Sequence, residues 1–331
     1  RSTLAKPPNC LTRRVHLSLA GGQLIWITAI LVLMAAAFTF LAGQSFASVA
    51  NARNIATDTC ILMVMALGQL LVIITGGIDL SVGAVLVFSG VLGCATMNAI
   101  GGTAGIFAGT VVSILCGCGW GAINGLLVTK ARISALIATL GTFGMAMGLA
   151  LVIANGIDLM APISLVRSLG VGRILGVVPW LVIVAAVAAV VVGVVLNQTR
   201  FGRHTLAIGA SSAAAERAGI PVGMHLVKVY MIAGGLAGLA SVMSLARFGT
   251  TTIGGHLEDN LKVITAVVLG GASLLGGIGT VTGTVIGTLI PVVLLNGFVI
   301  TGIQAFWQQF AIGLVLVVAV FLDSRKRSAS V

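Results

Sequence analysis

The stretch IITGGIDLSVG, from Ile73 to Gly83, lies between two long apolar runs and decides how the rest of the chain is interpreted. It places a single carboxylate, that of Asp79, among glycines at membrane depth or at the membrane edge. An acid is costly to bury there, so its presence usually marks a structural or functional task. The glycines interrupt the apolar pattern and indicate a break between two hydrophobic elements.

The pattern returns about 190 residues later as VVLGGASLLGG, from Val267 to Gly277. The aligned pairs are Gly76 with Gly270, Gly77 with Gly271, Leu80 with Leu274 and Gly83 with Gly277. Two glycine-broken hydrophobic elements in corresponding positions are typical of transport pathways in membrane proteins. The sequence therefore indicates an internal repeat, and the candidate pathway or gating residues in it are Gly76, Gly77, Asp79, Ser81, Gly270 and Gly271.

Composition settles the class of protein. Hydrophobic residues make up 58% of the 331 residues and charged residues 8%, and the mean hydropathy is +1.18. Too few polar side chains remain to cover a soluble domain of this length, so we expect an all-α, polytopic integral membrane protein. The five cysteines and four histidines lack paired metal-ligand spacing, and we expect no metal site.

Apolar windows near 20 residues, the length that crosses a bilayer, predict about ten transmembrane or re-entrant helices. The windows are 22–42, 55–75, 79–99, 104–128, 133–154, 177–197, 225–246, 260–272, 278–299 and 305–322. The eighth window is short enough to be re-entrant. We therefore expect a cytoplasmic N-terminal tail at 1–21, one transmembrane domain at 22–322 with a cytoplasmic connection at 197–224, and a basic cytoplasmic tail at 323–331.

The basic residues indicate orientation. The net charge of +11 would suggest nucleic acid as the partner of a soluble protein, but in a membrane protein basic residues mark the cytoplasmic loops. With a cytoplasmic N-terminus, 13 of the 18 lysines and arginines fall inside and 5 outside. The outside set is Arg53, Arg167, Arg173, Arg247 and Lys262. An even number of crossings places both termini in the cytoplasm, and no nucleic-acid partner is expected.

The cytoplasmic connection at 197–224 has the signals of an interaction element. Ser211 and Ser212 can cap a short helix that runs through Arg217, and Gly219 can end it before Pro221. Such a short exposed helix cannot bury a core of its own and needs a partner surface. The alternative is a solvated connector whose arginines only set topology.

Three polar residues inside or beside the apolar runs have two interpretations each. Asp79 either bonds backbone N–H groups at the start of the third span or contacts solute and gates a pathway. Asn124 and Asn296, each followed by glycine, are either hydrogen-bonding contacts between helices or pore-lining residues. A second GIDL at 156–159 places Asp158 in an outer loop, and we interpret this repetition of the motif as chance.

Together these segments resemble one known family, the permease subunits of bacterial ABC importers for monosaccharides, the group that imports ribose, xylose, arabinose and autoinducer-2. The resemblance covers residues 47–323. The matching stretches are ALGQLLVIITGGIDLSVG at 66–83, GAINGLLVTKARI at 121–133, IATLGT at 137–142, FGRHTLAIGASSAAAERAGI at 201–220, AVVLGGASLLGGIGTVTGTVIGTLI at 266–290 and FWQQ at 306–309.

The resemblance implies a pore subunit in the bacterial inner membrane that moves a small sugar by alternating access. Its partners would be a second permease copy or paralogue, cytoplasmic ABC ATPase subunits and a periplasmic sugar-binding protein, with membrane lipid around it. The ATPase-coupling residues of the family fall on Ala214, Ala215, Glu216, Arg217, Gly219 and Ile220. The sequence has no GxxxxGK[ST] phosphate loop, so we expect energy to come from a partner. The resemblance implies a transporter subunit that is no enzyme and binds no cofactor, with ATP and Mg used by the partner ATPase.

The chain departs from its relatives at Ser134–Ala135, Ala210–Ser211 and His256–Asp259, where they commonly carry proline, Gly-Asn and a Tyr-Glu-Leu run. These departures affect loop geometry and substrate. Residues 256–262 form a charged cluster that either meets the binding protein or is a solvated loop.

Other functions remain as alternatives. Related permeases import nucleosides or branched-chain amino acids. An ion-coupled secondary carrier would need acids or histidines in mid-span, and an intramembrane enzyme would need paired catalytic groups at one depth. The sequence favours neither, and it leaves the identity of the sugar and the choice between homodimer and heterodimer open.

Overall fold

The computed structural model describes the backbone of residues 10–328. The tail residues 1–9 and 329–331 lie outside the described part, as do the side chains before Leu24 and those at positions 305, 316, 319, 320 and 322–328. The elements are α1 (Cys10–Ala42), η1 (Gly43–Ser45), α2 (Val49–Ile74), α3 (Val82–Ile100), α4 (Gly102–Thr129), α5 (Ala135–Ile153), α6 (Ile163–Leu165), η2 (Val166–Gly170), β1 (Arg173–Ile174), β2 (Val178–Pro179), α7 (Trp180–Gln198), α8 (Arg200–Ala210), α9 (Ser212–Arg217), α10 (Val222–Phe248), η3 (Ile253–His256), α11 (Asp259–Leu269), α12 (Val281–Ile300) and α13 (Ala305–Ser328).

The prediction of a polytopic helical membrane protein is confirmed. Within the described residues, eight helices are long and apolar enough to cross a membrane, namely α1 to α5, α7, α10 and α12. Helix α13 occupies the tenth expected window. The eighth window is α11, whose 11 residues span about 16 Å at the 1.5 Å rise of a helix, roughly half the hydrocarbon thickness.

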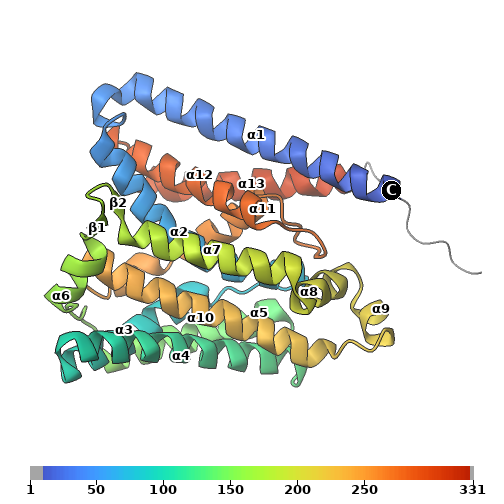
Figure 1. Ribbon diagram of the computed structural model, residues 1–331, viewed down its shortest axis with the longest axis horizontal. Helices are drawn as coiled ribbons and strands as arrows, with labels where there is room; N and C mark the ends of the chain where they lie inside the picture. The colour runs from blue at the N-terminus through green and yellow to red at the C-terminus, as the bar shows by residue number, and fades with distance from the viewer. Residues whose placement is uncertain (1–9, 329–331) are drawn as a thin grey trace, which may run out of the picture.

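The long helices lie side by side along the long axis of the molecule (Figure 1). One end carries α8 and α9 and also the start of α1, and the other end carries α6 and the hairpin of β1 and β2. That hairpin is antiparallel, with Arg173 opposite Pro179 and Ile174 opposite Val178. In the connection between α5 and α6, Asp158 Oδ1 accepts hydrogen bonds from Thr251 Oγ1 (2.8 Å) and Ile253 N (2.7 Å). Asp158 therefore joins two loops, a role that its interpretation as a chance repetition missed.

Glycines at four-residue spacing bring helix backbones into contact. A Cβ at Gly117 would lie 2.1 Å from Gly234 O, and a Cβ at Gly121 would lie 2.1 Å from Tyr230 O. Helices α4 and α10 can therefore approach this closely only because both carry glycine there. Lipid supplies no hydrophobic drive for helix association, so close van der Waals packing holds such pairs together.

The connection at 197–224 contains two helices where the sequence predicted one. Helix α9 is the expected element, but α8 before it was not predicted. Thr199 caps α8, since its Oγ1 accepts a hydrogen bond from Gly202 N at 3.3 Å. Two glycines in α8, Gly202 and Gly209, weaken its helical signal. Tertiary contact overrides that weakness, because Gly202, Thr205 and Ile208 are buried.

Candidate functional site

Helices α2 and α11 end in the same way. After α2, Gly77 N donates to Val72 O (3.1 Å) and Gly76 N donates to Ile73 O (2.9 Å). After α11, Ala272 N donates to Val267 O (3.1 Å) and Gly271 N donates to Val268 O (2.9 Å). Both are Schellman endings, which need a residue with positive φ. Gly76 (φ 81°) and Gly271 (φ 91°) fill that position.

The structure corrects the register of the internal repeat. Gly76 corresponds to Gly271 and not to Gly270, which has an ordinary helical φ of −63°. The two breaks also differ in length, because α3 starts at Val82 and α12 only at Val281. Adjacent glycines in each motif made both alignments look equally good in sequence. The repeat is therefore one of helix endings followed by helix starts, with unequal connections.

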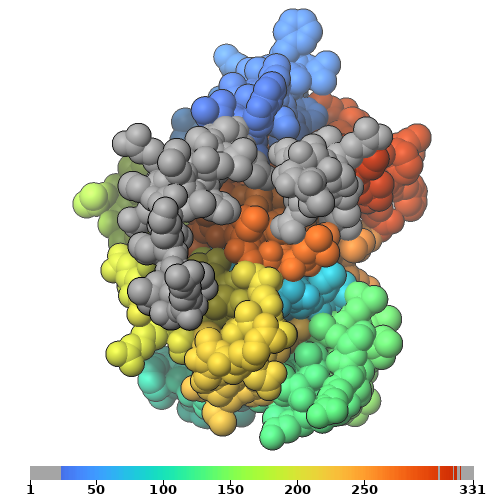
Figure 2. Space-filling view, turned by 90° about the vertical axis from the view of Figure 1, so that its right-hand side faces the viewer, coloured from blue at the N-terminus to red at the C-terminus, as the bar shows by residue number. Residues whose placement is uncertain are grey.

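The two breaks meet each other and α8 at one end of the bundle. Gly277 N donates a hydrogen bond of 2.8 Å to Ile74 O. Gly209 of α8 lies against both, since a Cβ there would be 1.7 Å from Ile74 O and 2.5 Å from Gly277 N. Figure 2 looks onto this end and shows the breaks, cyan and orange, next to each other above the yellow surface of α8 and α9. We call this contact the inner junction.

Asp79 is held in the first break by four hydrogen bonds. Its Oδ1 accepts from Ser81 N (2.8 Å) and Ser81 Oγ (2.6 Å). The Gln69 amide, oriented so that both its groups are satisfied, donates to Asp79 O and accepts from Asp79 N, each at 3.1 Å. Helix α3 begins only at Val82, so Asp79 does not lie in its first turn. The carboxylate instead bonds the backbone N–H of Ser81, the N-cap residue of α3, and so holds the turn at the start of the helix.

A chain of hydrogen bonds continues from Ser81 to two other helices. Asn124 Nδ2 of α4 donates to Ser81 Oγ (2.8 Å), and Thr142 Oγ1 of α5 donates to Asn124 Oδ1 (2.6 Å). All four side chains, from Asp79 to Thr142, are buried. Buried polar groups of this kind are costly unless each is paired, and here each has a partner. Asn124 therefore links helices, which matches one of its two predicted roles.

Asn296 lies apart from this group, on α12. Its Nδ2 donates to Asn51 Oδ1 of α2 and its Oδ1 accepts from Asn51 Nδ2, both at 2.9 Å. The structure thus brings the two breaks into contact and links Ser81 of the first break to Asn124. Asn296 is not part of this group. Whether any of them contacts solute stays a prediction.

Helix α9 has the predicted capped form. Ser211 Oγ accepts from Ala214 N (3.2 Å), and Gly219 (φ 82°) completes a Schellman ending in which Ile220 N donates to Ala215 O (3.1 Å). Ala215 is buried, whereas Ala214, Glu216, Arg217 and Gly219 are exposed. Helix α9 thus presents an exposed face at the same end of the bundle as the inner junction, with Ala215 packed inward.

Three residues of this site were missed by sequence reasoning. Gln69 and Gly209 lie in quoted motifs but act through contacts that only the fold creates. Tyr230 Oη is buried beside Gly77, where a Cβ would be 2.8 Å away, and has no hydrogen-bond partner in the part of the chain that the structure describes. The sequence did mark Tyr230 as unusual, since it is the single tyrosine of a largely apolar chain.

Comparison with known proteins identifies relatives of this chain. A family model described as the branched-chain amino acid transport system / permease component matches residues 51–320. Ribose import permease protein RbsC of Escherichia coli (strain K12) is 34% identical over 305 residues, which cover 91% of this chain and 93% of that protein. RbsC of Bacillus subtilis (strain 168) is 38% identical over 287 residues, or 86% and 88%. The L-arabinose ABC transporter permease protein AraH of Azospirillum brasilense is 31% identical over 278 residues, or 84% and 81%. No solved structure matches the chain.

The two roles of Asp79 can be separated by substitution. Asp79→Asn keeps an oxygen that can accept from Ser81, whereas Asp79→Leu leaves buried donors unpaired at about 1 to 3 kcal/mol each. If Asp79 holds the break, we expect membrane yield and thermal stability to fall clearly in Asp79→Leu and only slightly in Asp79→Asn. Wild-type stability in both variants, measured by thermal unfolding in detergent, would contradict the structural role.

Proposed function

The chain belongs to this family of transport-system permease components, and we propose that it is the membrane-spanning subunit of an ATP-driven importer for a small sugar. The observation that carries the proposal is the near full-length match to permeases named for ribose, L-arabinose and D-allose, each at 31 to 38% identity. All three are neutral monosaccharides. We therefore propose a pentose, a hexose or a related polyol as the solute.

Energy would come from a separate ATPase that seats on α9. The chain contains no phosphate-loop motif of its own. The exposed face of α9 around Glu216 offers a docking surface, and Ser211 joins α9 directly to α8. Because Gly209 of α8 touches Ile74 and Gly277, a displacement of α9 would move both breaks together. Such rigid-body coupling fits alternating access around a fixed site.

The remaining partners follow from the same proposal. A second permease copy or paralogue would complete the pathway, and a periplasmic sugar-binding protein would deliver solute at the end that carries β1 and β2. The charged residues 256–262, which the sequence offered to that binding protein, lie largely inside the fold, since His256 and Asp259 are buried. The exposed hairpin around Leu175 is a better candidate for the contact, with 94% of this residue accessible.

The chain is a multi-pass membrane protein, and we propose that it lies in the bacterial inner membrane with both termini in the cytoplasm. The support is the excess of basic residues on that side, 13 against 5, together with the start of α1 lying at the same end as α8 and α9 (Figure 1). In a cysteine-free variant, Ser211→Cys should resist a membrane-impermeant thiol reagent in intact cells and react once the inner face is opened. Leu175→Cys is the matched control and should react from outside. The reverse pattern would invert the orientation.

The proposed function is tested by reconstitution. The chain, its ATPase and its binding protein are placed in liposomes with radiolabelled D-ribose, L-arabinose, D-allose, a nucleoside or L-leucine. We expect ATP-dependent uptake of at least one sugar and none of the nucleoside or of leucine. The family description leaves branched-chain amino acids as the runner-up. Uptake of leucine or the nucleoside without sugar uptake would replace the proposal, and sugar uptake driven by an ion gradient without ATP would overturn it.

The inner junction makes a separate prediction about coupling. Gly209→Ala places a methyl group against two backbones that cannot yield, an overpacking that typically costs about 1 to 3 kcal/mol. We expect the variant to lose most solute-stimulated ATP hydrolysis and uptake in the reconstituted importer. Gly223→Ala is the control, because the nearest atom to its Cβ would be Thr129 Cβ at an ordinary 3.8 Å. Equal uptake and ATPase stimulation in both variants would exclude a coupling role for the junction.

A further inference from the structure

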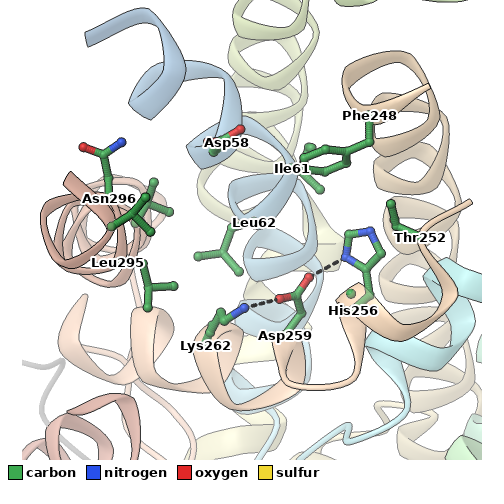
Figure 3. Close-up of a pocket in the computed structure, with 13 residues that line it drawn as sticks. Asp58, Ile61, Leu62, Phe248, Thr252, His256, Asp259, Lys262, Leu295 and Asn296 are labelled. Atoms are coloured by element: carbon green, nitrogen blue, oxygen red, sulfur yellow. Dashed lines mark hydrogen bonds and ion pairs between the residues drawn. The ribbon is translucent and has the colours of Figure 1, made fainter. Parts of the chain in front are cut away.

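A cavity of about 440 Å³ lies between α2, α10, α11 and α12, away from the inner junction (Figure 3). Its volume is in the range of sites for small molecules. Leu62, in its wall, follows the start of α2 at Val49 by 13 residues, or about 20 Å along the helix. The cavity therefore reaches from the end of the bundle that carries β1 and β2 toward the middle.

One wall of the cavity holds a buried ionic network. Asp259 Oδ2 is 2.6 Å from His256 Nδ1, and Asp259 Oδ1 accepts from Lys262 Nζ at 2.8 Å. His256 Nε2 is 2.8 Å from Ser244 Oγ of α10. Only 6%, 11% and 18% of the side chains of His256, Asp259 and Lys262 are exposed. Burying charges inside a membrane protein is costly and contributes little net stability, so such groups usually mark a functional site.

Thr252 supplies an unpaired polar group beside this network. It lines the cavity between Phe248 and His256 (Figure 3), and its Oγ1 is buried without a hydrogen-bond partner among the residues that the structure describes. Its φ of 43° is left-handed, which is rare and strained for a β-branched residue. Strained residues and unsatisfied buried groups concentrate at ligand sites. Two independent features therefore mark the same wall as a site.

The opposite wall combines a neutral amide with apolar surface. Asn296 uses one N–H and its oxygen in the pair with Asn51, so its second N–H remains available. Apolar lining on this side comes from Val292, Leu295 and Val299 of α12, and Ile61 and Leu62 of α2 add to it. An apolar lining with a few convergent polar groups is the usual composition of a small-molecule site.

The charges of the cavity are balanced. Asp58 is paired with Arg247 at 2.9 Å, and Asp259 is paired with Lys262. A zwitterionic amino acid would need an available cation and an available anion, and both acids here already have counter-charges. A neutral solute rich in hydroxyl groups needs only donors and acceptors. Lys262 Nζ, with three donors and one used by Asp259, and Thr252 Oγ1 can provide them.

We propose that this cavity is a solute-contact site within the chain itself, at which Thr252, Lys262 and Asn296 hydrogen-bond the hydroxyl groups of a neutral polyhydroxylated solute and Phe248 packs against its carbon face. The class of solute rests on the proposed function. The site itself rests on the cavity, its buried ionic wall and the unpaired hydroxyl of Thr252.

The first test removes that hydroxyl in the reconstituted importer. Thr252→Val keeps the β-branched shape and loses no bond within the protein, so thermal stability should stay the same or rise. Uptake of D-ribose, or of the sugar that the wild type transports best, should fall about 3- to 10-fold, the effect of one hydrogen bond. Thr252→Ser should restore most of the rate. Thr110→Val on α4, whose hydroxyl bonds only Ile106 O of its own helix, is the control and should transport normally.

The second test reads binding without transport. Thr252→Cys in a cysteine-free variant is labelled with a thiol reagent in the presence of that sugar or of L-leucine. Slower labelling with the sugar alone supports the site. Protection by leucine, with or without the sugar, or protection by neither compound overturns it. Wild-type uptake in Thr252→Val would also overturn it, whereas failure of the wild-type complex to import any sugar would overturn the proposed function and leave the labelling result to decide the site.

Discussion

The structure depends on one constraint. Where the backbone leaves a helix inside a membrane, its N–H and C=O groups must find hydrogen-bond partners within the protein. The two breaks satisfy that need by lying against each other. Each begins with the same Schellman ending, and Gly277 N bonds Ile74 O across them. Gly76 and Gly271 allow the two turns because both have positive φ, and Gly209 lets α8 contact both breaks. Asp79 and its hydrogen-bonded neighbours then hold the first break in the shape that this contact requires.

Helix α11 connects the two regions of interest. It begins beside the cavity, where Asp259 and Lys262 form part of the wall, and ends at Leu269, just before the second break. Asn260 Oδ1 accepts a 2.7 Å hydrogen bond from Gly83 N of α3. The N-terminal end of α11 is therefore also bonded to the helix that follows the first break. Under the proposed function, movement of α9 would therefore reach the cavity through the inner junction, the second break and α11.

The sequence predicted the spans and the capped helix α9, because each follows from a local pattern of residues. Local pattern could not place Gly209 against Ile74 and Gly277, since that contact joins three distant segments. The one-residue error in the repeat arose because paired glycines fit either register, and only the positive φ of Gly271 decides between them. The cavity was invisible for a similar reason. Its residues come from four helices and from the connection between α10 and α11, and the left-handed φ of Thr252 has no sequence signal at a β-branched residue.

The shortness of α11 has a consequence for biogenesis. A segment of 11 residues that opens with a buried acid cannot partition into lipid alone, as a full-length span can when it leaves the translocon. It must enter the bilayer together with neighbours that cover its ends, and these include the later helices α12 and α13, the latter through the contact of Gln309 with Glu258. Insertion of α11 to α13 is thus a concerted step, and a ribosome that stalls before α13 would leave α11 without a stable place in the membrane.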